Sequence, residues 1–171
     1  MNYLRLPTQE RLKELFDYNP ETGEFIRKIK TNGFSKPGSV AGSLNKGGYV
    51  KMSVDKRMYQ AHRLAWMYVY GEDPGKLEVD HRNHIKNDNR IANLRLSTHI
   101  QNGYNREGFS KTGYKGVKFH KYSGLYEALI TINKKRKYLG YFKTPEEASE
   151  AYQKASREHH GVYSCLSNKI K

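Results

Sequence analysis

Leu77-Glu78-Val79-Asp80-His81-Arg82 places a carboxylate directly before an imidazole, within a segment suited to a β-strand. A polar loop follows, and Asn93-Leu94-Arg95-Leu96 then has the composition of a second strand. Ser97 or Thr98 can cap a helix that carries Asn102. The centre of the chain is therefore expected to fold in the order strand, loop, strand and helix.

The Asp80-His81 pair joins two groups that metal-dependent hydrolysis uses. A carboxylate can hold a hard divalent cation, and an adjacent imidazole can take a proton from water. Alternatively, Asp80 and His81 end a surface hairpin, and Asn93 and Asn102 are turn and cap residues, as asparagine often is. A base candidate beside a metal-ligand candidate is the kind of cluster that an active site needs, so the combination favours a site.

The charge balance favours a polyanion as partner. The 171 residues include 31 Lys and Arg against 17 Asp and Glu, which gives a formal net charge of +14. The basic residues are spread along the chain, which fits a folded surface that neutralises phosphates and releases their counterions. A basic protein without such a partner is the alternative, but solubility alone does not require so large an excess.

Neither a membrane span nor a disulfide framework is expected. The longest apolar stretch, residues 64–70, is too short to cross a bilayer, and residues 1–5 lack the apolar core of a signal peptide. We therefore expect a cytoplasmic protein. Cys165 is the only cysteine, so the fold must be held by hydrophobic packing rather than by an intrachain disulfide or a cysteine-rich zinc site.

Capping and turn residues delimit the remaining elements. In the first part of the chain, we expect a short helix capped by Thr8 and ending near Asn19-Pro20, strands over residues 24–30 and 49–55, and a helix over residues 61–70 that stops at Gly71. In the last part, we expect strands around residues 114–117, 125–132 and 136–141, and a helix that starts with the capping sequence Thr144-Pro145-Glu146-Glu147. Three strands and one helix should pack as two layers.

The central motifs resemble the HNH endonuclease family, and most closely its phage homing endonucleases. The motifs that carry the resemblance are His62-Arg63-Leu64-Ala65-Trp66, Val79-Asp80-His81, Asn93-Leu94-Arg95-Leu96 and Gln101-Asn102. The resemblance implies a two-stranded ribbon and a helix that hold one divalent metal, with Asp80 and Asn102 as protein ligands. It also implies that His81 is the general base and that Asn93 orients the His81 ring through a hydrogen bond.

The metal is expected to be magnesium or manganese, because these ions suit oxygen ligands. Many members of the family carry a histidine where Asn102 stands, and asparagine binds soft metals more weakly than imidazole does. His99, three residues earlier, is the alternative ligand, but only Asn102 has the family's spacing. His62 either packs in the structure or touches phosphate. No small-molecule cofactor is expected besides this one cation.

The C-terminal motifs resemble the DNA-binding domain of the plant Apetala and ethylene-response-factor class, which also occurs attached to phage HNH nucleases. They are Tyr114-Lys115-Gly116-Val117, Tyr138-Leu139-Gly140-Tyr141-Phe142 and Thr144-Pro145-Glu146-Glu147-Ala148. The resemblance implies a three-stranded sheet in the major groove with a helix on its other face. Alternation along the strands directs Lys118, His120, Thr131, Arg136 and Tyr138 toward DNA and Tyr126, Ala128, Ile130 and Ile132 toward the helix.

The sequence thus predicts an α+β protein of small modules that acts as a monomer on double-stranded DNA. The modules are an N-terminal α+β region over residues 1–60 with Arg27 and Lys51 at the DNA, an HNH ββα-metal core over 61–106 with Arg63 at the DNA, a basic linker over 107–113 and an Apetala-like domain over 114–171. We expect a homing-type endonuclease that nicks one strand per active site. The alternatives are a DNA-binding regulator with an inactive HNH scaffold and, less favoured, an RNA-cleaving enzyme.

Overall fold

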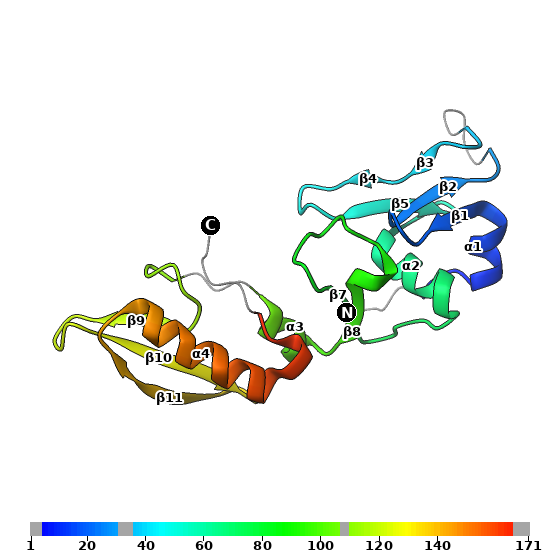
Figure 1. The fold of residues 1–171 in the computed structure, drawn as a ribbon. Coiled ribbons are helices and arrows are strands. Elements are labelled where there is room, and N and C mark those ends of the chain that lie inside the picture. The colour runs from blue at the N-terminus through cyan, green and yellow to red at the C-terminus, as the bar shows by residue number, and fades with distance from the viewer. Residues whose placement is uncertain (1–4, 31–35, 107–109, 166–171) are drawn as a thin grey trace. The chain divides into compact units, whose positions relative to one another are not determined.

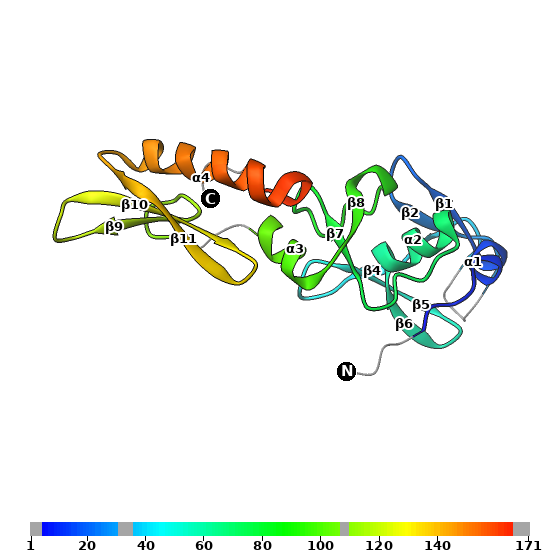
Figure 2. The ribbon, with the colours of Figure 1, turned by 90° about the horizontal axis from the view of Figure 1, so that it is seen from below.

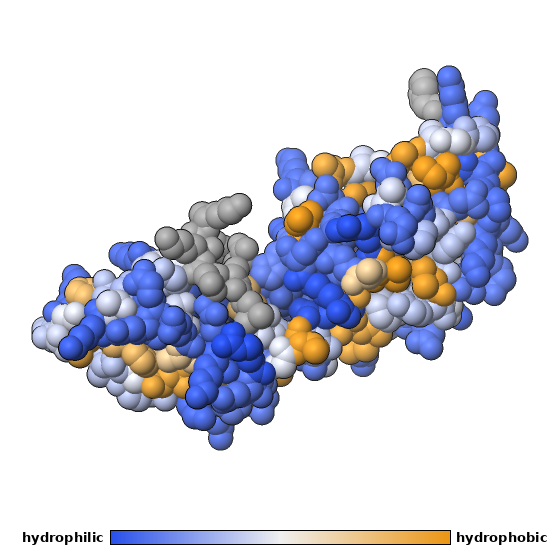
Figure 3. All heavy atoms as spheres, in the orientation of Figure 1, coloured by the Kyte–Doolittle hydropathy of each residue, from blue (hydrophilic) through white to orange (hydrophobic). Residues whose placement is uncertain are grey.

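The computed structural model describes residues 5–30, 36–106 and 110–165. The chain forms two compact units, Met1–Thr98 and His99–Lys171 (Figure 1). Both units combine helices with small antiparallel sheets, so the predicted α+β class is confirmed. No helix within these ranges is long and apolar enough to span a bilayer. Hydrophilic residues dominate the face drawn in Figure 3, and apolar residues form small groups on it.

The first unit builds its sheets in the orders β1-β2-β3, β4-β5-β6 and β7-β8. Its elements are α1 (Gln9–Leu15), β1 (Phe16–Asn19), β2 (Glu24–Arg27), β3 (Val40–Ala41), β4 (Ser43–Leu44), β5 (Val50–Val54), β6 (Arg57–Gln60), α2 (Ala61–Tyr70), β7 (Glu78–His81), η1 (Ile91–Asn93) and β8 (Leu94–Ser97). The strand β6 was not predicted from the sequence. The helix α2 has the predicted bounds and ends at Gly71, whose φ of 70° allows its N–H to bond Met67 O.

The helix α1 begins as predicted but ends earlier. The Thr8 hydroxyl accepts a hydrogen bond from the Arg11 N–H and so caps the first turn. The helix stops at Leu15 rather than near Asn19, because Phe16 and Tyr18 alternate with exposed residues and bury their rings as a strand does. Both rings contact Phe25 of β2, at centroid distances of 6.0 and 4.9 Å.

The first 60 residues and the segment after them share one hydrophobic core. Leu12, Phe25 and Met52 pack in the same cluster as Leu64 of α2 and Leu94 of β8. A segment of about 60 residues with these short sheets has little apolar surface to close a core of its own. The expected boundary at residue 60 therefore falls inside a packed unit.

The second unit packs one long helix on one face of a three-stranded sheet, as predicted (Figures 1 and 2). Its elements are α3 (His99–Asn105), β9 (Val117–His120), β10 (Leu125–Ile132), β11 (Lys135–Phe142), α4 (Pro145–His160) and η2 (Gly161–Tyr163). Thr144 and Glu147 form the predicted capping box, with both reciprocal hydrogen bonds present. Ala128 and Ile130 of the sheet are buried, as are Ala148 and Tyr152 of α4.

Gly116 lies where α4 approaches the sheet and is expected to tolerate no side chain. Its φ is 73°, and a Cβ there would lie 2.1 Å from Tyr152 Cδ2 and 2.6 Å from Leu129 O. Gly116→Ala should therefore lower the free energy of unfolding by about 3 kcal/mol, through left-handed strain and overpacking together. Gly124→Ala is the control, since its φ is 69° but nothing lies within 4 Å, and should cost about 1 kcal/mol. Equal losses in urea unfolding would contradict the packing argument.

Candidate active site

The ribbon of β7 and β8 carries the predicted acidic residue and histidine. Asp80 pairs across the strands with Arg95, and His81 pairs with Leu94. Asp80, His81 and Arg95 are each less than one-tenth exposed. Charged and titratable groups of this kind are rarely buried without specific partners. The ribbon of β7 and β8 therefore buries three charged or titratable side chains in the interior of the first unit.

Asp80 forms a buried ion pair with its cross-strand neighbour. The Arg95 Nε donates to Asp80 Oδ2 at 2.9 Å, and the Arg95 Nη2 lies 2.7 Å from the same oxygen. The guanidinium compensates a carboxylate that would otherwise be strongly disfavoured at this depth. A carboxylate has two oxygens and several lone pairs, so it can serve a guanidinium and a cation together.

His81 is held by Asn89, a residue that the sequence did not single out. The His81 Nε2 lies 3.1 Å from Asn89 Oδ1, and Asn89 is 3% exposed. Because an amide oxygen only accepts, the bond requires a proton on Nε2 and assigns the proton-accepting lone pair to Nδ1. Burial lowers the pKa of His81, although the bond to Asn89 and the charges of Asp80 and Asp88 oppose that shift. The ring is therefore neutral near pH 7, as a general base must be.

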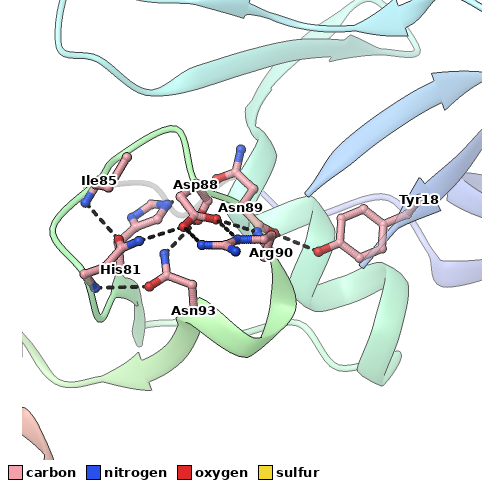
Figure 4. A network of polar contacts seen from close by, with 8 residues as sticks. Tyr18, His81, Ile85, Asp88, Asn89, Arg90 and Asn93 are labelled. Carbon is pink, nitrogen blue, oxygen red and sulfur yellow. Dashed lines mark hydrogen bonds and ion pairs between the residues drawn. The ribbon is translucent and has the colours of Figure 1, made fainter. Parts of the chain in front are cut away.

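Asn93 is bonded to the loop that follows β7. Its Oδ1 accepts from the Asn83 N–H at 3.1 Å, and its Nδ2 donates to Asp88 O at 2.8 Å (Figure 4). Asn93 precedes β8 directly, so its side chain reaches the two ends of the loop that leads out of β7. The His81 ring is bonded to Asn89, and the orienting role that the family resemblance implies for Asn93 remains a prediction. Asn93 is bonded to the loop that carries Asn89.

The N-terminal hairpin supports Asn89 from the other side. The buried Tyr18 hydroxyl donates to Asn89 O at 2.7 Å, and burial raises the pKa of Tyr18 to about 12. Gly23 lies against the same backbone, where a Cβ would come within 2.4 Å of Arg90 N. Residues 83–92 show no periodic pattern in the sequence, so only their richness in asparagine hinted at a structural role. Which of those asparagines meets His81 depends on a hairpin more than 60 residues away.

A second histidine packs against His81. The two rings are 5.0 Å apart and nearly perpendicular, and the Tyr49 ring lies 5.6 Å from His62 and 6.0 Å from His81. Burial, and then the nearby His81 and Arg63, lower the pKa of His62 to about 3. The His62 Nδ1 has no hydrogen-bond partner among the described residues. His62 is therefore a neutral packing partner for His81, which fits the structural alternative given for it above.

Comparison with known proteins identifies the segment that contains this ribbon. Residues 59–104 match the family described as HNH endonuclease. This segment belongs to the HNH endonuclease family. The uncharacterized HNH endonuclease L560 of Acanthamoeba polyphaga mimivirus is 31% identical over 128 residues, which make up 74% of this chain and 66% of the viral protein. The chain thus spans slightly less than two thirds of that relative.

Other similarities involve plant proteins and one solved structure. The ethylene-responsive transcription factor ERF117 of Arabidopsis thaliana is 44% identical over 71 residues, 40% of this chain and 21% of the plant protein. The AP2-like factor AIL7 of the same plant is 31% identical, covering 68% of this chain and 24% of its own length. The structure of the HNH homing endonuclease I-HmuI has a TM-score of 0.43 and 22% identity, covering 85% of each chain.

The two residues predicted as metal ligands carry oxygen donors, which hard divalent cations prefer. Among the described residues, no group of three His, Cys, Asp or Glu side chains is placed to hold a metal ion. Asp80 offers a carboxylate, and Asn102 offers an amide oxygen on α3, which belongs to the second unit. Magnesium commonly uses one or two carboxylates and completes its shell with water and substrate phosphate. His99 opens the same helix and is exposed.

The helix α3 is fixed within the second unit. The Tyr104 ring stacks on His160 at 3.7 Å with an interplanar angle of 9°, and the Asn133 N–H donates to the Tyr104 hydroxyl at 3.1 Å. The Lys115 ammonium donates to Tyr104 O at 2.7 Å and also to Arg106 O, at the C-terminal end of the helix. The residue predicted as the second metal ligand therefore lies on a helix held by elements that follow it in the chain.

The DNA-contact candidates of the first unit are partly engaged by the chain itself. The Arg63 guanidinium donates to Leu77 O at 2.9 Å and Gly75 O at 3.1 Å and lies 3.6 Å from Asp73. The Arg27 guanidinium donates to the Ser39 hydroxyl at 3.2 Å and to the Val40 carbonyl, and Lys51 is half-buried on β5. Arg63 in particular is placed to hold the loop before β7.

The candidates of the second unit lie on the sheet face away from α4. Lys118, Arg136 and Tyr138 are exposed, and His120 is half-buried with its Nδ1 3.0 Å from the Ser123 hydroxyl. Their direct cross-strand partners lie on β10 and alternate along it with the buried Ala128 and Ile130. These partners are Leu125, Glu127, Leu129 and Thr131.

The loop of the HNH segment should weaken at low pH through Asp88. Hydrogen bonds from Arg90 and Asn83 lower the pKa of Asp88 to about 2, below its ordinary value of 3.8. Asp88 therefore stabilises the fold above about pH 4, and this contribution fades as the pH falls toward 2. With screening at the exposed Arg90, Asp88→Asn should cost about 1–2 kcal/mol at pH 7 and progressively less below pH 4. Urea unfolding measured across this range tests the trend.

The matched control is Asp17→Asn, because the Asp17 carboxylate lies 3.7 Å from Lys28 and its side chain is 68% exposed. Its effect on unfolding should stay below about 0.5 kcal/mol at every pH. A loss in Asp88→Asn that does not change between pH 7 and pH 3 would show that the Asp88 charge is not the stabilising factor.

Proposed function

We propose that the protein is a DNA endonuclease that hydrolyses a phosphodiester bond with one divalent cation, magnesium or manganese. The single observation that carries the proposal is the buried, neutral His81, oriented by Asn89 and adjacent to Asp80. A binding protein has no need of an oriented base beside a carboxylate in its interior. Membership of the HNH endonuclease family supports the same reaction class.

In the proposed reaction, His81 Nδ1 accepts a proton from the water that attacks the phosphorus atom. Asn89 retains the proton on Nε2 and keeps the ring directed, while Asn93 and Tyr18 hold the backbone of Asn89 in place. Asp80 and Asn102 would hold the cation. When bound, the cation supplies positive charge that stabilises the pentavalent phosphate and the departing oxygen. The described residues of the chain contain one such centre, so the simplest product is a nick in one strand.

The proposed DNA contacts combine both units. The outer face of the β9-β10-β11 sheet would enter the major groove through Lys118, His120, Arg136 and Tyr138. Arg27 and Lys51 would supply phosphate contacts from the first unit, whereas Arg63 would act mainly by holding the loop before β7. Affinity should fall steeply with salt, since each neutralised phosphate releases counterions.

One observation favours a second candidate function. The Asp80–Arg95 pair binds the guanidinium to an oxygen of the proposed metal ligand, and a permanent pair of this kind would leave an inactive scaffold. The protein would then be a sequence-specific DNA-binding regulator. Both functions predict salt-sensitive binding, but only the endonuclease predicts metal-dependent cleavage.

Replacing the proposed base should abolish cleavage without affecting DNA binding. Wild type and His81→Ala are incubated with supercoiled DNA that carries the gene's native flanking sequence, with magnesium, manganese or a chelator. We expect nicking only with metal and a loss of at least about 100-fold in the variant, the usual contribution of a general base. His159→Ala, an exposed histidine of α4, is the control and should cleave as wild type does. Specific binding without cleavage by the wild type would favour the regulator.

The bond from Asn89 gives a further test through the pH dependence of cleavage. Because burial lowers the pKa of His81, the wild-type rate should rise at a lower pH than an ordinary histidine base would give. Asn89→Asp adds a negative charge beside Nε2–H, raises the pKa of His81, and should move the rising part of the profile to higher pH. Asn89→Ala should reduce the rate by about 10–100-fold, as lost orienting groups do.

Asn87→Ala changes an exposed asparagine of the same loop and should leave both the rate and its pH profile unaltered. The orienting role is refuted when Asn89→Asp and Asn89→Ala both reproduce the wild-type profile.

A further inference from the structure

One acidic side chain lies in the middle of the sheet face assigned to DNA. Glu127 belongs to the central strand β10, and its direct cross-strand neighbours are Lys118 on β9 and Tyr141 on β11. Its chain neighbour Ala128 is fully buried in one cluster with Ala148 of α4. Figure 2 shows α4 lying along one face of this sheet. Successive side chains of a strand point to opposite faces, so Glu127 lies on the outer face with Lys118.

The surroundings of Glu127 are otherwise basic and aromatic. The Tyr141 ring lies 5.4 Å from His120 and 5.5 Å from Tyr138, so aromatic rings extend across the face. Tyr138 is 52% exposed and Tyr141 is 43% exposed. Such a surface complements the negative potential and flat bases of a DNA groove, and a carboxylate at its centre opposes that attraction.

The Glu127 carboxylate has no ion pair or hydrogen bond within the described parts of the chain, although Lys118 lies directly opposite. Glu127 is half-buried. A bound duplex would remove its remaining water, and a carboxylate that loses water without gaining donors is strongly disfavoured. Phosphates offer acceptors only and repel it. Contact with DNA is therefore favourable only where a base presents a donor to this position.

The major groove offers two such donors, and they differ in their surroundings. Cytosine presents its N4 amino group, whereas adenine presents its N6 amino group directly beside the acceptor N7. A carboxylate accepts from either amino group but is repelled by N7. Cytosine is therefore the base that an anionic Glu127 matches.

We propose that Glu127 determines specificity by accepting a hydrogen bond from the N4 amino group of a cytosine in the major groove. The proposal rests on the proposed function, since it requires that the outer face of the β9-β10-β11 sheet contacts DNA. Glu127 would thereby read a base, whereas the basic side chains of this face contact phosphates and its aromatic rings do not distinguish cytosine by its amino group.

The experiment selects bound duplexes from a randomised pool with the full chain, in chelator so that no cleavage occurs. For the wild type we expect one position to be enriched in cytosine, with about 5–150-fold discrimination against other bases, the range equivalent to 1–3 kcal/mol. In Glu127→Gln the preference should change to adenine, because an amide can bond both N6 and N7. In Glu127→Ala the preference should disappear.

The matched control is Glu150→Gln, which removes an equal charge from an exposed position of α4. It should raise affinity for all sequences and retain the cytosine preference. The proposal is overturned when both Glu127 variants keep the wild-type preference and gain affinity uniformly, as the control does. Lys118→Ala and Arg136→Ala test whether the outer face contacts DNA. If both variants bind DNA as the wild type does, the outer face is not the DNA contact. If both bind more weakly but the Glu127 variants keep the wild-type base preference, only the role of Glu127 is overturned.

Discussion

The hydrogen bond between His81 and Asn89 is the interaction on which the candidate site depends. It fixes the proton on Nε2, directs the ring and joins β7 to the loop after it. The loop keeps its shape because Asn93 bridges its two ends and because Tyr18 binds the backbone of Asn89. The N-terminal hairpin is thus part of the construction of the site, which explains why residues before and after position 60 share one core.

Burial gives the same site its electrostatic character. It keeps His81 neutral and His62 neutral, so that two adjacent imidazoles can pack without repulsion. It also makes Arg95 necessary, because Asp80 would otherwise be an uncompensated charge in the interior. The Arg95 guanidinium contacts Oδ2 of the Asp80 carboxylate and so stabilises the folded ribbon.

Features governed by local chemistry could be predicted from the sequence. Thr8, Gly71 and the Thr144–Glu147 capping box each mark a helix end, since caps act within a few residues. The strands around Asp80 followed from composition and turn signals. The role of Asn89 could not be predicted, because it depends on Tyr18 and Gly23 packing against the loop from a distant hairpin. The bounds of the first unit could not be predicted for the same reason, because its hydrophobic core is formed by residues far apart in the sequence.

The anchoring of α3 bears on how proteins of this kind can exchange parts. The helix is held by Lys115, Asn133 and His160, all of which follow it in the chain. A recombination joint placed between α3 and β9 would therefore transfer the sheet without the helix that is built onto it, and the helix would lose its stacking partner. A joint before His99 keeps these contacts within one inherited piece. A segment that carries the sheet together with the helix built onto it therefore begins at His99 and includes Asn102.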